Sequence, residues 1–180
     1  MTQFLQAIRP APPQLTETAL NGVVQETVRL LQPEIENRGL TLQTLLARSL
    51  PALLIDPAQL KQALVNLVKN AIQAMTKGGT LILQTGQGGD GVWVSVSDTG
   101  TGIPQEQINR IFEPFYTTKK KGTGLGLMIV QRIVRDHGGR IELESSPHRG
   151  TTFRIWLPLH DRPPRLLEET TSSQERNEKS

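Results

Sequence analysis

Apolar side chains recur with a helical period in three segments, which predicts helices at residues 18–37, 57–75 and 124–137. Glycine follows each segment within a few residues, at Gly39, Gly78 and Gly138. Glycine often follows a helix because it adopts left-handed backbone angles without strain. The second helix also has a start signal, since Asp56 supplies an N-cap side chain and Pro57 stands at the first helical position. One face of this helix is apolar and is expected to pack on the core: Leu60, Leu64, Leu67, Ala71 and Met75.

Shorter apolar segments, bounded by Gly, Asp and Pro, predict strands between and after these helices. The predicted strands are residues 40–46, 80–86, 91–97, 140–145 and 151–157.

Residues 98–123 are rich in Gly, Thr, Pro and Lys and lack sustained periodicity. A loop of this length inside a compact domain is usually functional or disordered. At the start of the chain, the proline cluster that begins at Arg9-Pro10 predicts a linker, because proline cannot continue a helix. We therefore expect a linker region at 1–14, one folded domain at 15–159 and a disordered polar tail at 160–180.

Composition narrows the functional classes. The chain is 36% apolar and 21% charged, as is usual for globular proteins, and it has no cysteine, which excludes disulfides and thiolate metal sites. The net charge is only +3 and the basic residues are scattered, so we expect no nucleic-acid partner. The one cationic run, Lys119–Lys121, is typical of a solvated loop rather than of a binding stripe. The sequence shows neither a signal peptide nor a membrane-spanning run, so a cytoplasmic location without membrane contact by this domain is expected.

Two asparagines, Asn66 and Asn70, are four residues apart on the second predicted helix and therefore project side by side. Asparagine is unfavourable inside helices because its side chain competes for backbone hydrogen bonds, and two of them cost about 1 kcal/mol relative to alanine. Gln59 and Gln73 lie near them on an uncharged stripe. Two interpretations fit: a solvated or capping pair, or a site in which the Asn70 carbonyl oxygen binds a hard cation such as Mg²⁺.

Asp98 ends a predicted strand whose alternate residues are valines. Because alternate residues share one face, its carboxylate points toward the core side, where a lone charge is unfavourable. The next residues include Gly100 and Gly102, which permit tight turns and close backbone approach. The carboxylate either caps this turn or accepts a hydrogen bond from a donor such as the exocyclic amine of adenine. Thr151 falls on the inward face of the last strand and is expected to share that network through a water.

A glycine-rich sequence, Gly122-Thr123-Gly124-Leu125-Gly126, opens the third predicted helix. A loop of this kind presents unpaired N–H groups of the helix N-terminus to an anion. The chain has no P-loop sequence, and the glycines follow a long loop rather than a strand, which excludes the dinucleotide-binding fingerprint. A phosphate site and a flexible packing turn both fit the motif alone.

The order of these motifs is more specific than any one of them. Asn66 to Asn70, Asp98 to Gly102, Ile111 to Tyr116 and Gly122 to Gly126 resemble the N box, first glycine box, F box and second glycine box of sensor histidine kinases. These kinases belong to the wider GHKL, or Bergerat, ATPase class that includes gyrase, Hsp90 and MutL. The resemblance covers about residues 15–159. The sequence Glu-Pro-Phe-Tyr-Thr-Thr-Lys is similar to the nitrogen-regulation class, and the residues before the proline cluster resemble the end of its dimerisation hairpin.

The resemblance implies an α/β (α+β) two-layer sandwich, in which a mixed sheet packs on about three helices and ATP lies beneath a mobile lid at about 99–123. It implies that Asn70 binds Mg²⁺, that Asp98 binds the adenine amine and that Asn66 is catalytic. The other residues that it assigns to the nucleotide are Gly100, Gly102, Ile103, Lys119, Gly122, Thr123, Gly124, Leu125, Gly126 and Thr151. Phe112 and Phe115 are expected either to couple the lid to the histidine-bearing domain or to pack within the lid.

Two positions separate this chain from parts of the superfamily. Asn66 stands where the hydrolysing relatives carry a glutamate base. Because an amide cannot accept that proton, the substitution favours transfer to a protein acceptor over attack by water. Gln73 stands where many histidine kinases carry a phosphate-binding lysine, and Lys119 or a neighbouring lid lysine is a candidate substitute.

The three histidines, His137, His148 and His160, all follow the N box, and none lies in an upstream helix, where the phosphoacceptor of this family is found. We expect them to be structural or exposed. The chain is therefore expected to bind MgATP as a monomer, but not to autophosphorylate efficiently without a dimerisation and phosphoacceptor domain. A response regulator would be the downstream partner.

Three other functions remain in view. An anti-sigma-factor serine kinase shares the ATP-binding fold, but the F box and the hairpin-like N-terminus argue against it. A gyrase-type ATPase is disfavoured by Asn66. A nucleotide-sensing module without transfer activity is disfavoured by the intact boxes.

Overall fold

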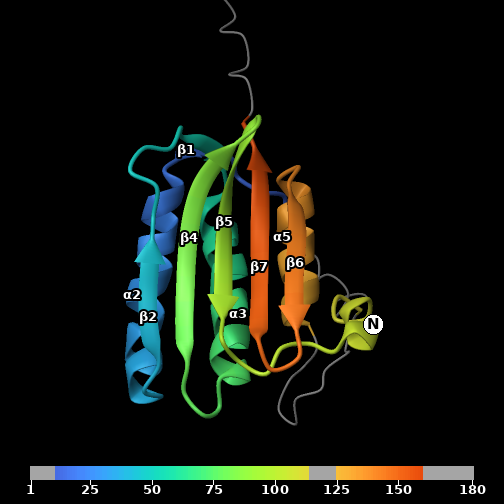
Figure 1. Cartoon of the computed structure of the whole chain (residues 1–180). Helices are drawn as coiled ribbons and strands as arrows, with labels where there is room; N and C mark the ends of the chain where they lie inside the picture. Colours follow the sequence, from blue (N-terminus) through green and yellow to red (C-terminus); the bar gives the residue numbers. More distant parts are fainter. Residues whose placement is uncertain (1–10, 114–124, 160–180) are drawn as a thin grey trace, which may run out of the picture.

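A five-stranded sheet forms one layer of the domain, and helices cover one of its faces (Figure 1). The computed structural model describes residues 11–113 and 125–159. The sheet has the order β2-β4-β5-β7-β6, in which β2 is parallel to β4 and the other neighbours are antiparallel. Its strands are β2 (Thr41–Leu45), β4 (Thr80–Gly88), β5 (Gly91–Asp98), β6 (Arg140–Ser146) and β7 (Gly150–Pro158). The helical layer contains α2 (Leu20–Asn37), α3 (Pro57–Ala74) and α5 (Gly126–Asp136). The expected two-layer sandwich with a mixed sheet is confirmed.

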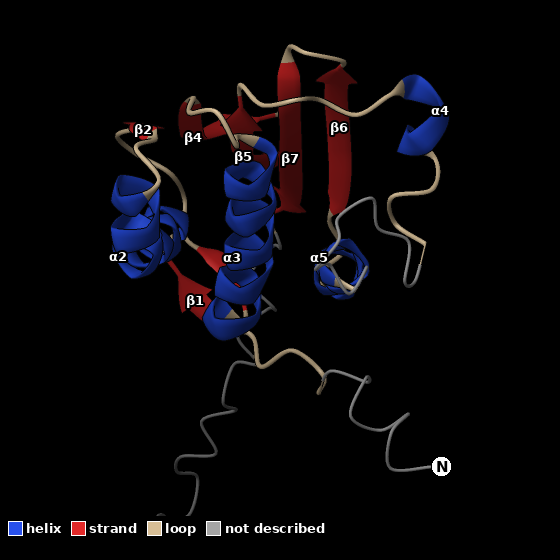
Figure 2. Ribbon diagram, turned by 90° about the horizontal axis from the view of Figure 1, so that it is seen from below, coloured by secondary structure: helices blue, strands red, loops and turns tan. Residues whose placement is uncertain are grey.

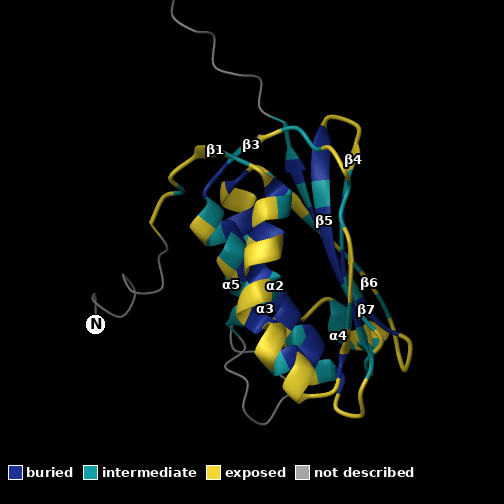
Figure 3. Ribbon diagram, turned by 90° about the vertical axis from the view of Figure 1, so that its left-hand side faces the viewer, coloured by how far each residue is buried: buried dark blue, intermediate teal, exposed yellow. Residues whose placement is uncertain are grey.

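The core lies between the two layers, which Figures 2 and 3 show from two further directions; Figure 3 colours each residue by its burial. Alternate residues of the central strands face the helices, as the period of two requires. The inward residues of β5 and β7 are buried: Val92, Val94, Val96, Phe153, Ile155 and Leu157. The predicted apolar face of α3 is buried as well, since Leu60, Leu64, Leu67, Ala71 and Met75 are each at most 3% exposed.

Three short elements escape the sequence analysis. Residues Thr16–Thr18 form β1, which pairs antiparallel with β3 (Leu53–Ile55). Because Thr18 belongs to β1, helix α2 begins at Leu20 rather than at residue 18. A one-turn helix, α4 (Gln105–Ile108), lies inside the segment predicted as an irregular loop. Elements of three or four residues are too short to show a hydrophobic period, and β1 and β3 are defined by a pairing between distant parts of the chain.

The outer face of the sheet carries an aromatic row. Gly86, Trp93, Trp156 and Arg140 are partners in register across β4, β5, β7 and β6. A side chain at Gly86 would clash with the Trp93 ring, so the glycine leaves room for the ring. The Arg140 guanidinium lies 4.4 Å from the Trp156 ring centroid, and that of Arg154 lies 4.6 Å from the Trp93 centroid. These cation–π contacts shield an otherwise uncovered part of the sheet.

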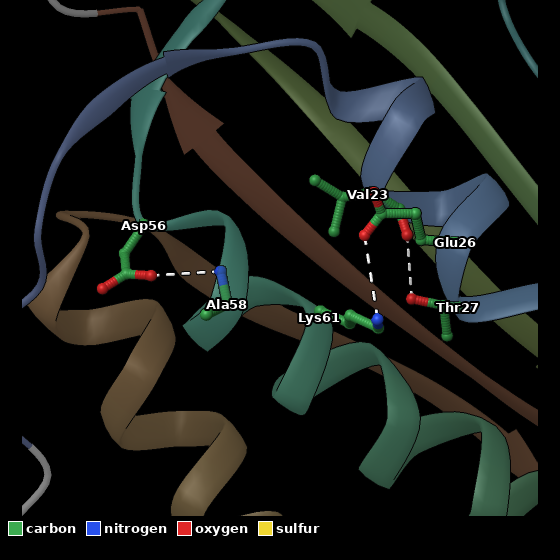
Figure 4. Close-up of polar contacts among 6 residues, drawn as sticks. All are labelled: Val23, Glu26, Thr27, Asp56, Ala58 and Lys61. Atoms are coloured by element: carbon green, nitrogen blue, oxygen red, sulfur yellow. Dashed lines mark hydrogen bonds and ion pairs between the residues drawn. The ribbon is translucent and has the colours of Figure 1, made fainter. Parts of the chain in front are cut away.

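Helix α3 begins where the sequence predicts. The Asp56 carboxylate accepts hydrogen bonds from the backbone N–H groups of Ala58 (3.1 Å) and Gln59 (3.2 Å), as an N-cap does. Figure 4 shows the Ala58 bond together with the ion pair between Lys61 and Glu26 (3.7 Å), which joins α3 to α2. Because both charged side chains are well exposed, this ion pair contributes at most about 1 kcal/mol.

Asp56 also joins three separate segments. Its carboxylate accepts the Gln14 backbone N–H (2.9 Å), and its own N–H donates to Nε2 of the buried His137 (3.0 Å). Since Nε2 accepts, the proton of the imidazole is on Nδ1, which donates to the Ile133 carbonyl (2.7 Å). His137 is therefore structural and His148 is exposed, as expected, whereas His160 lies outside the described residues.

Burial raises the pKa of the Asp56 carboxyl, but the N–H donors of Gln14, Gln59 and Ala58 and the nearby His137 outweigh burial, so this pKa lies below its ordinary value. A carboxyl whose pKa is lower in the folded state stabilises the fold while it is ionised, and this contribution is lost as the pH falls through the folded-state pKa.

Among the described helices, none is long and apolar enough to cross a membrane.

We predict that Asp56→Ala lowers the free energy of unfolding by about 1–2 kcal/mol at pH 7, because the cap and the Gln14 bond are lost. Urea unfolding measures this difference. The exposed Asp136→Ala on α5 is the matched control and should change stability by less than about 0.5 kcal/mol. The difference between wild type and Asp56→Ala should shrink as the pH falls from 7 toward 3; a difference that grows at low pH would contradict this account.

Candidate functional site

A row of polar side chains closes the helix-facing side of the sheet at one end, where β5 ends and β7 begins (bottom of Figure 1). Asp98 of β5 pairs in register with Thr151 of β7, and Thr151 pairs with Ser145 of β6. Directly opposed residues on antiparallel strands have Cβ atoms about 5 Å apart, so Thr151 adjoins both Asp98 and Ser145. Thr151 is buried and the other two are half-buried. The predicted neighbourhood of Asp98 and Thr151 is therefore present.

Sequence reasoning missed Ser145. Its hydroxyl oxygen lies 2.8 Å from the Ile103 backbone nitrogen, 2.8 Å from Thr151 Oγ1 and 3.1 Å from the Gly150 carbonyl oxygen. The signal was available, because Ser145 continues the inward alternation of Ile141 and Leu143 along β6. One hydroxyl thus ties the start of the long loop at Ile103 to the β7 residue beside Asp98.

The Asp98 carboxylate also caps the turn that follows it. Its Oδ1 accepts the Gly100 N–H at 2.8 Å, which is the turn-capping role that the sequence left open. An ionised carboxylate is a pure acceptor with about four acceptor positions, so capping a turn and accepting from a ligand are compatible roles.

The glycines after Asp98 allow two backbone segments to approach the loop closely. A side chain at Gly100 would clash with the Ala74 carbonyl at the end of α3, and one at Gly102 would clash with the Ser146 carbonyl at the end of β6. Gly102 also has a φ of +70°, which is unfavourable for other residues. Thr101 is bonded on both sides, through its N–H to Ala74 (3.2 Å) and through its carbonyl to the His148 N–H (2.7 Å). These glycines therefore hold the floor of the site by close packing.

Helices α3 and α5 meet beside this floor. The Asn66 side-chain amide donates to the Gly126 carbonyl at 3.4 Å, which brings the predicted N box and the start of the predicted phosphate-binding helix together. Asn70 lies one turn further along α3, half-buried. Leu125 directly precedes α5, and its carbonyl accepts the Ile129 N–H at 3.0 Å, so the helical bonding starts there.

The remaining predicted residues divide into two groups. Lys119, Gly122, Thr123, Gly124 and Phe115 lie outside the described residues. Phe112, which the structure describes, is half-buried against the core. Gln59 does not belong to the candidate site, because its amide donates to the Ala11 carbonyl at 2.8 Å, and Gln73 is exposed.

A metal site built from protein side chains alone is not present in the described part of the chain. No group of three or more His, Cys, Asp or Glu side chains there could hold an ion. A single amide such as Asn70 nevertheless suits Mg²⁺, which keeps several waters and commonly binds through substrate phosphates.

These features define a nucleotide-binding domain of the Bergerat type. They are the inward carboxylate of Asp98, the loop whose glycines pack closely against α3 and β6, and the helices α3 and α5 on a mixed sheet. Residues 55–161 match the family of histidine kinase-, DNA gyrase B- and HSP90-like ATPases. The match extends over more than half of the chain, and the chain belongs to this family.

Within the family, the chain is similar to sensor histidine kinases. It is 37% identical over 160 residues to the sensor histidine kinase ZraS of Escherichia coli (strain K12), a match that covers 89% of this chain and 34% of ZraS. It is 36% identical over 160 residues to sporulation kinase E of Bacillus subtilis (strain 168), covering 88% of this chain and 22% of that kinase. The chain thus spans about a third or less of the length of these relatives.

Solved structures give the same result. The catalytic domain of histidine kinase ThkA superimposes with a TM-score of 0.74 at 34% identity, covering 81% of this chain and 95% of that domain. Full-length ShkA in complex with AMPPNP gives a TM-score of 0.76 at 28% identity, covering 87% of this chain and 34% of ShkA. ThkA in complex with the response regulator TrrA gives 0.74 at 28% identity, covering 88% of this chain and 46% of that one.

We predict that Gly102→Ala destabilises the domain more than Gly39→Ala does. Both glycines have a similar φ, +70° and +65°, so alanine costs about 1–2 kcal/mol of backbone strain at either position. Only Gly102 adds a clash with the Ser146 carbonyl, whereas the space around Gly39 is open. Thermal or urea unfolding of the two variants measures the difference, and equal destabilisation would show that Gly102 is not held against β6.

Proposed function

We propose that this chain is the catalytic and ATP-binding domain of a sensor histidine kinase. It binds MgATP and transfers the γ-phosphoryl group to a histidine on a separate dimerisation and phosphoacceptor domain. The observation that carries the proposal is the inward pair of Asp98 and Thr151 at the end of the sheet, beside the helices that bear Asn66 and Gly126.

Adenine recognition is the role of the polar row. The half-buried Asp98 carboxylate is a pure acceptor that also caps the turn at Gly100, and the exocyclic amine of adenine is a pure donor. Gly100, Gly102 and Ile103 form the loop that borders this position and that Ala74, Ser146 and Ser145 hold in place. The similarity to ShkA, whose structure holds AMPPNP, supports ATP as the ligand.

The triphosphate is assigned to the start of α5. Its N-terminal N–H groups and the preceding Gly122-Thr123-Gly124 sequence suit an anion. Asn70 would hold Mg²⁺ through its carbonyl oxygen, and the ion supplies charge neutralisation at the phosphates. Lys119 is the proposed substitute for the phosphate-binding lysine that Gln73 replaces.

In the transfer step, the imidazole nitrogen of the acceptor histidine forms a bond to the γ-phosphorus while the bond to the bridging oxygen of ADP breaks. ADP leaves with the electron pair of that bond. Asn66 is the proposed catalytic residue, and it orients the reacting groups in this step. Its own side chain is positioned by the hydrogen bond to the Gly126 carbonyl. Because an amide is not a base, water is not activated at this position, which favours the protein acceptor.

The segment before the domain links it to the acceptor domain in this proposal. Residues 1–14 form the end of the dimerisation hairpin and the linker, 15–159 the catalytic domain and 160–180 a tail. The end of this segment docks on the domain, because the Gln14 N–H donates to Asp56 and the Gln59 amide donates to the Ala11 carbonyl. The downstream partner is a response regulator, by analogy with the ThkA complex with TrrA. The domain is cytoplasmic in this proposal. In isolation it is a monomer, and light scattering, which measures its mass in solution, tests this.

Calorimetric titration with ATP, with and without Mg²⁺, tests the nucleotide site. We expect one saturable site in the micromolar to millimolar range that Mg²⁺ strengthens. Asp98→Asn should weaken binding at least about tenfold, because one acceptor becomes a donor that faces the adenine amine. The exposed Asp90→Asn in the β4–β5 turn should bind like wild type. A folded wild type that binds no adenine nucleotide would disprove the proposal.

Phosphotransfer to an added acceptor separates the kinase from a nucleotide sensor. With radiolabelled ATP and Mg²⁺, the chain alone should remain unlabelled, and a histidine kinase phosphoacceptor domain supplied in trans should become labelled. Asn66→Ala should lower the labelling rate at least about tenfold while ATP affinity changes less than about threefold. Gln62→Ala, exposed on the same helix, is the control. If ATP binds but no acceptor of this class is labelled, the sensing function is favoured.

A further inference from the structure

The Ser145 hydroxyl has three hydrogen-bonding neighbours but only one proton. Ile103 N–H can only donate to it, the Gly150 carbonyl oxygen can only accept from it, and Thr151 Oγ1 can do either. A hydroxyl offers one donor and two acceptor positions, so all three contacts are satisfied in one way only. Ser145 donates to Gly150 and accepts from both Ile103 and Thr151.

This arrangement commits the Thr151 proton to Ser145. In the alternative, Ser145 donates to Thr151 and the Gly150 carbonyl lacks this bond. That arrangement is less favourable by the free energy of one hydrogen bond. With its proton committed, Thr151 Oγ1 presents only lone pairs in its other directions. The neighbouring Asp98 carboxylate is also a pure acceptor. At the end of the inner sheet face, Thr151 Oγ1 and the Asp98 carboxylate are therefore two adjacent acceptors.

We propose that Ser145 is a positioning residue that sets the base specificity of the nucleotide site, by holding the Thr151 hydroxyl in its acceptor orientation. The inference rests on the proposed function and deepens it. A purine with an amine at position 6 supplies donors to this pair, directly or through a water. A purine with a carbonyl at that position brings a third acceptor and keeps a single donor, N1–H, on that edge, so at least one of the two acceptors loses its partner.

Inosine triphosphate is the probe, because its base carries a carbonyl where that of ATP carries the amine. Calorimetric Kd values for both nucleotides, with Mg²⁺ present, give a discrimination ratio for each variant, defined as the Kd for inosine triphosphate divided by the Kd for ATP. The ratio narrows when it approaches 1. In Ser145→Ala the Thr151 hydroxyl is released to rotate and donate, so the ratio should narrow by about threefold to tenfold. Ser145→Thr keeps the hydroxyl and should keep the wild-type ratio. Ser49→Ala, at an exposed serine outside the site, is the matched control.

A purely structural role predicts a different result. If Ser145 only anchors the loop through Ile103, then Ser145→Ala weakens both nucleotides by the same factor and leaves the ratio unchanged, which would overturn the proposal. Thr151→Val provides a second route if Ser145→Ala does not fold. It removes the oriented acceptor and should also narrow the ratio, and an unchanged ratio there would equally overturn the inference.

The double variant Ser145→Ala/Thr151→Val tests whether the two residues act as one unit. We expect it to narrow the ratio no further than Thr151→Val alone, because Ser145 acts through Thr151. Additive effects on the ratio would contradict this order of action. Failure of the proposed function gives a different result, because the folded wild type would then bind neither ATP nor inosine triphosphate. That result would also overturn the role of Ser145.

Discussion

The register of β7 between β5 and β6 is the constraint on which the candidate site depends. It places Thr151 beside both Asp98 and Ser145. Because side chains alternate along a strand, a slip by one residue would turn Thr151 to the outer face and expose Phe153, Ile155 and Leu157. Burial of these three residues makes such a slip costly. On the outer face, Thr152 and Ser97 share a hydrogen bond of 2.8 Å, so polar pairs on both faces agree with one register.

Close backbone approach then places the loop that leaves β5. Gly100 lies against α3 and Gly102 against β6, and a side chain at Gly150 would clash with the Asp98 carbonyl. These contacts join the end of α3, the end of β5 and the β6–β7 hairpin into one unit. The first residues of the proposed lid are thereby held against this unit.

The two helices that flank the site are joined at two levels. Asn66 bonds to Gly126 near the site, and Asp56 bonds to His137 at the opposite end of α5. The second junction also receives Gln14 of the proposed linker. The incoming chain is thus fixed to the start of α3 and the end of α5. In the proposed kinase, this junction is where the catalytic domain meets the segment that leads to its phosphoacceptor domain.

Local patterns along the chain are enough to predict the three long helices, the five sheet strands and the inward direction of Asp98 and Thr151, because each follows from a hydrophobic period or a helix signal. The order of the motifs also identified the family. Long-range packing, in contrast, sets the β1–β3 pair, the docking of Gln14 on Asp56 and the convergence of Ile103, Gly150 and Thr151 on Ser145. These contacts join residues whose positions depend on long-range strand pairing, and a lone serine in a strand carries no local signal of its partners. The sequence pattern determines which face a side chain occupies, but the register of neighbouring strands decides which hydrogen bonds it makes.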